Sequence, residues 1–318
     1  MQQFLAMVGR NIKLFFKDKG VFFTSLITPL ILLLLYSTFL SNVYEDSFTS
    51  SLPEFFKVSD DLIGGVVGGQ LISSLLAVSC VTVSFCANMI MVNDKVTGVD
   101  KDFHLTAIKK PTLALSYYVA TTITTLIVAY VAMGAGFIYL GAKGWFLSVA
   151  DVFLIIADVF ILVTFGTALS SVINYFLTTQ GQISAVGTIV SSCYGFICGA
   201  YMPIASFGEG LQKALSFLPG TYGTALIKNH VLGGTFEEMI DQGFPSEVVE
   251  RIKDSIDCNI YFFGDKISTG AMYGVMLGAI LVLIAVYVLL HVFDVNSLLS
   301  KRPKKSKKQT KPKLERTD

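Results

Sequence analysis

Six stretches of this chain are long and apolar enough to cross a lipid bilayer as helices, and they constrain its fold more than any other feature. A bilayer core about 30 Å thick needs roughly 20 apolar residues in a helix. The stretches are continuously apolar and lack the alternation of a transmembrane barrel. The sequence therefore predicts an all-α integral membrane protein whose residues 21–293 form six transmembrane helices, approximately Val21–Leu40, Val66–Val92, Leu113–Leu140, Val152–Ile173, Ile183–Met202 and Thr269–Phe293.

Composition supports a membrane location. Of the 318 residues, 53% are hydrophobic and only 15% are charged, whereas soluble domains carry roughly 25% charged residues. A larger soluble core cannot absorb the excess, because single cores stop growing at about 250–300 residues. The five cysteines show no CxxC spacing and the three histidines lie far apart in sequence, so we expect free thiols and no metal site.

Basic residues predict the orientation of the chain. Lysines and arginines concentrate in the N-terminal stretch, in the loop between the second and third spans, and in the C-terminal tail. Loops rich in Lys and Arg stay in the cytoplasm. We therefore expect a multi-pass protein of the cell (plasma) membrane with both termini in the cytoplasm.

Three segments outside the spans have their own character. Residues 1–20 form an amphipathic pattern with basic flanks, which is typical of a helix in the membrane interface; it would anchor the chain or dock a cytoplasmic partner. Residues 294–318 are polybasic, so we expect a disordered cytoplasmic tail that favours anionic lipid rather than nucleic acid. Residues 203–268 read as an outer hairpin followed by a helical loop, with helix starts at Thr235 and Ser246.

Several residues inside the spans are unusual. A carboxylate in a bilayer is costly, so Asp158, and more weakly Asn88, are candidates for a transport pathway or for structural hydrogen bonds. Small residues one helical turn apart allow close helix packing, either within the chain or at a dimer seam: Gly187, Ser191, Gly195 and Gly199. Prolines predict three helix breaks, at Pro29, Pro203 and Pro219.

Familiar catalytic signatures are missing from the sequence. It contains no GxxxxGK[ST] phosphate loop, no HExxH and no GxSxG. We therefore predict no catalytic residues and no ATP site on this chain.

Two stretches and the order of elements resemble a known family. The loop after the second span reads Asn93-Asp94-Lys95-Val96-Thr97-Gly98-Val99-Asp100-Lys101-Asp102-Phe103, with Pro111 beyond it. The end of the fifth span reads Met202-Pro203, followed by Phe217-Leu218-Pro219-Gly220-Thr221-Tyr222. Together with the interfacial helix and the six spans, these stretches resemble the permease subunits of type-2 ABC exporters, the ABC-2 transporter family, over residues 1 to about 295.

The resemblance implies a function. Two permease chains, identical or different, would enclose the pathway, and separate ABC-type ATPase subunits would bind ATP and Mg. The inner loop 93–112 and the N-terminal helix would couple to those subunits. The expected coupling residues are Asp94, Lys95, Gly98, Asp100, Lys101 and Asp102. The alternatives are a membrane protein outside transport, such as an intramembrane enzyme or a sensor, and an ion channel.

Overall fold

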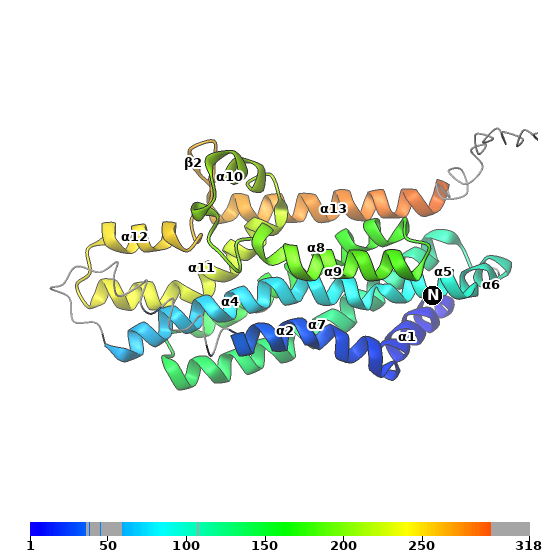
Figure 1. The fold of residues 1–318 in the computed structure, drawn as a ribbon, viewed down its shortest axis with the longest axis horizontal. Coiled ribbons are helices and arrows are strands. Elements are labelled where there is room, and N and C mark those ends of the chain that lie inside the picture. The colour runs from blue at the N-terminus through cyan, green and yellow to red at the C-terminus, as the bar shows by residue number, and fades with distance from the viewer. Residues whose placement is uncertain (36–37, 39–44, 46–58, 107, 294–318) are drawn as a thin grey trace, which may run out of the picture.

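The chain folds into an elongated bundle of helices that run close to one long axis (Figure 1). The computed structural model describes residues 1–318 except 36–37, 39–44, 46–58, 107 and 294–318. Its helices are α1 (Gln2–Lys17), α2 (Lys19–Leu35), α4 (Asp60–Ala87), α5 (Met89–Thr97), α6 (Val99–Leu105), α7 (Lys110–Lys143), α8 (Val149–Tyr175), α9 (Gln180–Ile197), α10 (Glu209–Leu215), α11 (Pro219–Asp241), α12 (Ser246–Ser255) and α13 (Thr269–Phe293).

Helix α4 forms the centre of the bundle. It begins where the Ser59 side chain accepts a hydrogen bond from the Leu62 amide, and almost every residue beyond that first turn is buried. A helix that is apolar on all sides belongs in a core. Helices α2, α7, α8, α9 and α11 pack around it, so α4 connects both ends of the molecule.

Four of the six predicted spans coincide with helices that are long and apolar enough to cross a membrane. These helices cover Asp60–Thr97, Lys110–Lys143, Val149–Tyr175 and Thr269–Phe293 among the described residues. The all-α membrane fold is confirmed, whereas the count of six remains a prediction. Part of the first predicted span lies outside the described residues, as does the predicted disordered tail.

The predicted fifth span is shorter than expected. Helix α9 ends at Ile197 rather than near Pro203. The chain reverses at Gly199, whose φ of 71° suits glycine, and the Tyr201 amide donates back to the Gly195 carbonyl at 3.0 Å. Pro203 instead precedes a short 3₁₀ turn, Ile204–Ser206.

The other two prolines do not break helices either. Helix α2 continues on both sides of Pro29. Pro219 occupies the first turn of α11, where the missing amide hydrogen costs nothing. It therefore starts a helix instead of ending one.

Helix α11 corrects the prediction for residues 203–268. The expected helix start at Thr235 is wrong, because α11 runs through Thr235 from Pro219 to Asp241. Leu226, Ile227 and Leu232 are buried along it, and the helix packs against α4, α8 and α13. Much of the predicted outer loop thus belongs to the bundle itself.

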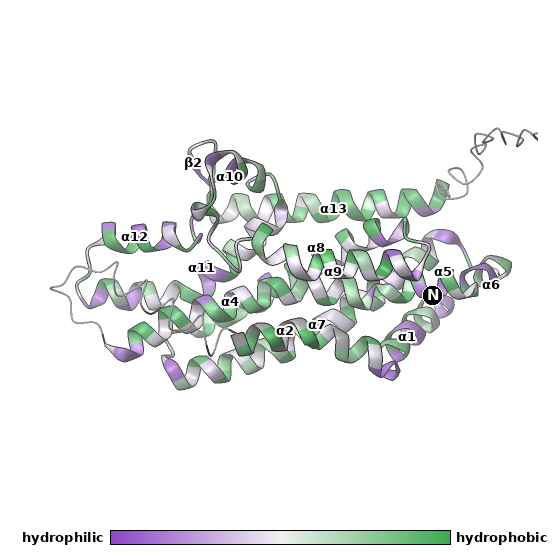
Figure 2. Ribbon diagram, in the orientation of Figure 1, coloured by the Kyte–Doolittle hydropathy of each residue, from purple (hydrophilic) through white to green (hydrophobic). Residues whose placement is uncertain are grey.

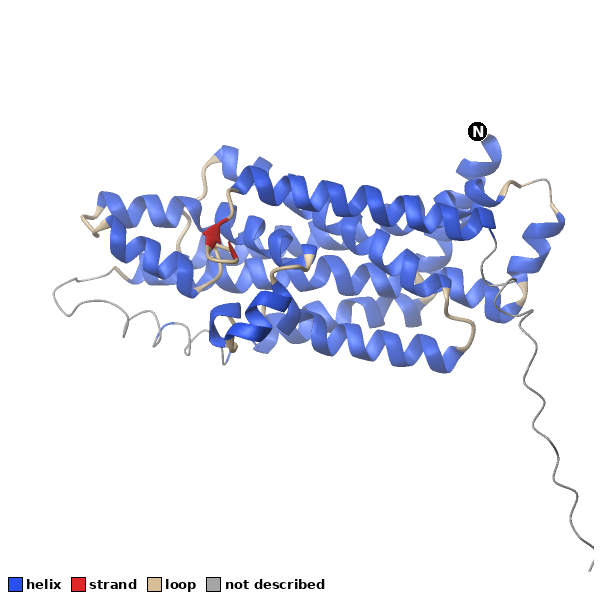
Figure 3. Ribbon diagram, turned by 90° about the horizontal axis from the view of Figure 1, so that it is seen from above, coloured by secondary structure: helices blue, strands red, loops and turns tan. Residues whose placement is uncertain are grey.

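The rest of this region forms a small layer on the bundle. Helix α12 begins at Ser246 as predicted. Strands β1 (Tyr261–Phe262) and β2 (Asp265–Lys266) pair antiparallel and form the hairpin drawn in red in Figure 3. Figure 2 shows hydrophilic residues gathered on α1 and α6 at one end and on α11 and α12 at the other, with apolar helices between.

Candidate functional site

The N-terminal helix is tied to the loop after the second predicted span by one ion pair. Arg10 on α1 donates two parallel hydrogen bonds to Asp94 on α5, at 2.7 and 2.8 Å. Tyr117 on α7 donates a third bond to Asp94, at 2.5 Å. Three helices therefore meet at one buried carboxylate.

The electrostatics of this junction favour a fixed geometry. The Arg10 side chain is 29% exposed, whereas that of Asp94 is buried. The hydrogen bond between Arg10 and Asp94 raises the pKa of the Arg10 guanidinium, although burial opposes this shift. The guanidinium also lies 5.1 Å from the ring centre of Phe103 on α6. Paired, fork-shaped hydrogen bonds of this kind fix orientation as well as adding energy.

Lys95 is also engaged within the chain. Its ammonium donates to the backbone carbonyl of Tyr175 at 2.6 Å, at the end of α8, and lies 5.0 Å from the Tyr175 ring centre. A positive charge is favourable at a helix C-terminus. Asp94 and Lys95 thus hold the loop onto the bundle, and their side chains face inward.

The outermost part of the loop is α6. Gly98, with a φ of 85°, lets the chain turn from α5 into α6. Lys101 and Asp102 are exposed and Asp100 is half-buried. The six predicted coupling residues therefore divide into an anchoring pair, a glycine in a turn and a charged tip.

Asp158 has partners that the sequence did not reveal. Its carboxylate contacts His230 Nδ1 of α11 at 2.5 Å and accepts a bond from the Tyr273 hydroxyl of α13 at 2.5 Å. The His230 and Tyr273 rings stack with centres 6.4 Å apart. Asp158 therefore joins three helices, and its role in a pathway remains a prediction.

Asn88 lies in a buried polar contact between α4 and α8. Its amide donates to Ser170 and Ser171, at 3.1 and 3.0 Å. Ser84, one turn earlier, approaches Thr167 at 3.3 Å. Asn88 therefore links α4 to α8, as interhelical polar contacts in membranes do.

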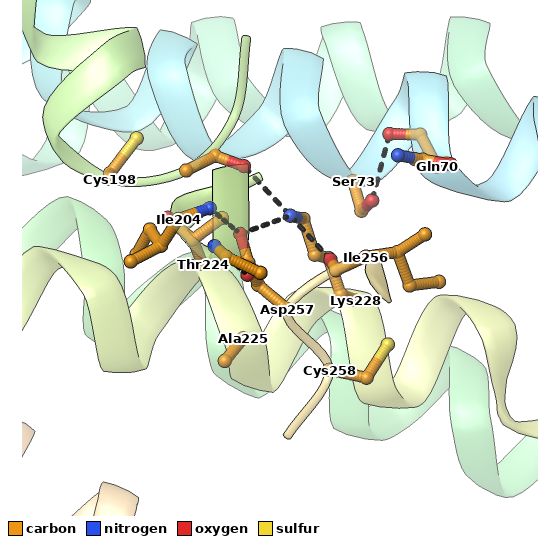
Figure 4. A network of polar contacts seen from close by, with 12 residues as sticks. Gln70, Ser73, Cys198, Ile204, Thr224, Ala225, Lys228, Ile256, Asp257 and Cys258 are labelled. Carbon is orange, nitrogen blue, oxygen red and sulfur yellow. Dashed lines mark hydrogen bonds and ion pairs between the residues drawn. The ribbon is translucent and has the colours of Figure 1, made fainter. Parts of the chain in front are cut away.

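Lys228 on α11 was missed by the sequence reasoning. It is 1% exposed and donates to the carbonyls of Gly199 and Ile256, at 2.8 Å each (Figure 4). Asp257 lies 3.9 Å away and accepts the Ile204 amide at 2.6 Å. Burial raises the pKa of Asp257, against the effect of Lys228. The signal in the sequence that could have indicated a buried lysine is the position of Lys228 directly after the apolar run Ala225-Leu226-Ile227.

The small residues of α9 make contacts within the chain. A Cβ on Gly195 would come within 2.3 Å of the Tyr201 ring, and one on Gly187 within 2.9 Å of Met89. The Ser191 carbonyl accepts from the Tyr201 hydroxyl at 3.4 Å. Gly199 lies in the turn after the helix, so the stripe is shorter than expected. A dimer seam on α9 remains a prediction.

No three His, Cys, Asp or Glu side chains come together closely enough to hold a metal ion within the described residues. The buried carboxylates of Asp94 and Asp158 instead pair with side chains of neighbouring helices.

Comparison with protein families gives a match over most of the chain. The family model described as ABC-2 type transporter matches residues 2–229. A search of curated proteins finds no match to this sequence. The matched range begins with α1, includes the loop with Asp94, and extends into α11 as far as Asn229.

Proposed function

Because this chain belongs to the ABC-2 type transporter family and is a permease component of an ABC transporter, we propose that it forms the export pathway as a dimer driven by a separate ATPase. The observation that carries this proposal is the junction of Arg10, Asp94 and Tyr117. This junction ties α1 to the loop 93–112 at one end of the bundle, so that the two would move together.

The position of this junction suits contact with a cytoplasmic subunit. The N-terminus, α5, α6 and the last described turn of α13 lie at the same end of the molecule (Figure 1). Hydrophilic residues gather there. We assign that end to the cytoplasm, in line with the basic residues of the N-terminal stretch, the loop and the tail.

Helix α6 is the proposed contact itself. Its exposed Lys101 and Asp102 and the exposed apolar Leu105 offer charged and apolar groups together. ATP and Mg would bind to the partner subunit. ATP-driven closure of the ATPase can shift the permease only by contacting two of its states differently. A tip fixed to α1, α7 and α8 through Asp94 and Lys95 would pass such a contact into the bundle.

Photo-crosslinking tests the proposal. A photoreactive residue at Asp102, in the full chain in its native membrane, should capture a subunit that hydrolyses ATP. The matched control carries the same group at Glu237, an exposed position shortly before the end of α11 at Asp241, and this end of the helix lies opposite α6 in Figure 1. Capture of an ATPase at neither position, or equally at both, would contradict the assignment of α6.

The charge of the tip gives a second measurement. Asp102→Lys should lower ATPase copurification about tenfold, which corresponds to about 1.4 kcal/mol. Glu237→Lys makes the same charge change at the other end and should leave copurification unchanged. The isolated chain should hydrolyse no ATP.

A further inference from the structure

Three aromatic side chains, two of them exposed and one half-buried, form a cluster between the end of α10 and the β1–β2 hairpin. Phe217 is 60% exposed and Phe263 is 66% exposed. The rings of Phe217, Phe262 and Phe263 meet edge to face, with centres 4.8 to 6.0 Å apart. Such rings at the surface of a folded chain need a partner or a special environment, because contiguous exposed apolar groups are rare.

The backbone places the most exposed of these rings, that of Phe263, in an unfavourable conformation. Phe262 pairs with Asp265, so Phe263 and Gly264 alone make the turn. Their φ angles are 52° and 100°. Two-residue turns of this kind favour Asn-Gly, and a bulky residue at positive φ is unusual. Turn formation alone therefore does not account for a phenylalanine at position 263.

The base of the hairpin is fixed, so the cluster projects from a firm support. Lys266 on β2 pairs with Glu250 on α12 at 2.9 Å. Tyr261 on β1 donates to Asp254 on the same helix at 3.0 Å. These polar contacts orient the strands, while the two-residue turn carries Phe263 and Gly264, with the exposed Asp265 directly after it.

The cluster lies where a bilayer around α13 would have its surface. The hairpin directly precedes α13, which begins at Thr269 and is apolar enough to span a membrane. Helix α10 and β2 project sideways beside the start of α13, not along the bundle axis (Figure 1). Leu277 and Leu281 are exposed on α13. An apolar helix surface therefore leads from the membrane interior toward the cluster.

We propose that Phe217 and Phe263 insert into the headgroup region of the bilayer and anchor the hairpin at the membrane surface. Aromatic residues are favoured at that depth. The anchor fixes the level of the layer made by α10, the hairpin and α12 relative to α13. It is an interaction surface for lipid and does not depend on the identity of the exported molecule.

Tryptophan fluorescence in lipid vesicles tests the proposal. The chain has one tryptophan, Trp145, so Trp145→Phe gives a silent background. Phe263→Trp then places a reporter at the tip. Glu247→Trp, at an exposed position of α12, is the control for water, and Leu281→Trp on α13 is the control for the bilayer interior. The probes are vesicles of phosphatidylcholine brominated near the headgroup or at the chain end, and aqueous iodide.

The proposal expects a distinct pattern at the tip. The fluorescence of the Phe263→Trp variant should be quenched at least twofold more by bromine near the headgroup than by bromine at the chain end. The Leu281→Trp variant should show the reverse order, and the Glu247→Trp variant should respond to iodide alone. Quenching of the tip reporter by iodide as strong as that of the water control would overturn the proposal. Protection of the tip reporter from both lipid bromine and iodide would also overturn it and would indicate a protein partner.

A second variant separates anchoring from folding. Phe263→Asn creates an Asn-Gly turn and should leave thermal unfolding in detergent unchanged or improved. In vesicles it should increase hydrogen exchange in α10 and the hairpin at least threefold over the unsubstituted chain. Equal exchange of the two proteins in vesicles would contradict the anchor.

Discussion

Replacing Asp94 by asparagine should loosen the N-terminal helix without unfolding the bundle. Asp94 accepts two bonds from Arg10 and one from Tyr117. Asparagine keeps the shape but loses the charge and presents only one acceptor oxygen. Helix α1 also buries Met7 and Phe15, so it should remain docked most of the time.

The magnitude follows from burial and exposure at the junction. Removing one partner of a buried ion pair costs about 3–5 kcal/mol. Arg10 keeps 29% exposure, so water compensates part of that loss, and we expect about 2–3 kcal/mol. Since 1.4 kcal/mol is a factor of ten, the undocked population of α1 should rise about 30- to 150-fold.

Hydrogen exchange of residues 2–17 in lipid nanodiscs measures this population, because exchange follows local opening. Asp94→Asn should accelerate exchange in α1 and leave α8 unchanged. Tyr117→Phe removes one of the three bonds and should give a smaller acceleration. Asp102→Asn is the matched control: it makes the same change at an exposed position of the same loop.

Two results would refute this reasoning. If Asp94→Asn and Asp102→Asn gave the same exchange in α1, the buried contact would not hold the helix. If Asp94→Asn accelerated exchange equally in α1 and α8, the residue would support the whole bundle and not one junction.

Three further perturbations follow from the other polar contacts. Lys228→Met should lower the free energy of unfolding by about 2–4 kcal/mol, measured by thermal unfolding, whereas the exposed Lys213→Met should change it by less than about 0.5 kcal/mol. The ion pairs of Glu250, chiefly the one with Lys266 on β2, lower the pKa of its carboxyl group to about 2. The contribution of these pairs to the stability of the layer made by α10, the hairpin and α12 is therefore present above the ordinary pKa of 4.5. It is lost as the pH falls from there toward about 2. The Glu250 side chain is 47% exposed, so the effect should stay under about 1 kcal/mol, and Glu250→Gln should remove the acid-dependent change in hydrogen exchange of the layer. Asp158→Asn should lower stability by about 1–3 kcal/mol and Tyr273→Phe by less; unchanged unfolding in both variants would show that this contact does not hold α8 to α13.

Local sequence patterns predicted the long helices well because the signal lies in each segment alone. Continuous apolar runs identified four spans, and Ser246 marked the start of α12. The end of α9 was placed too late, because the turn depends on the left-handed conformation of Gly199 and not on Pro203. Helix α11 was missed because its glycines, Lys228 and His230 lower its hydropathy, while tertiary packing stabilises it.

The candidate sites show the same limit. The loop with Asp94 was identified from its own residues, yet its bond to Arg10 joins positions 84 residues apart. Asp158 was noticed as an intramembrane carboxylate, but its partners come from α11 and α13. Burial next to a carboxylate depends on how helices pack, and one sequence does not contain that information in any local pattern.

The continuity of α4 and α5 has a geometric consequence for motion. Asn88 between them keeps helical backbone angles, so Asp60–Thr97 is one apolar rod of 38 residues. At 1.5 Å per residue the rod is about 57 Å long. If it pivots as a rigid lever about one end, a tilt of about 10° displaces the other by about 10 Å. Asp94 sits near one tip of this lever, and Gly65 and Gly69 pack near the other, against Phe146 and Leu232. In such a pivot, a small rotation at the charged loop would change the packing of Gly65 and Gly69 at the far end of the rod.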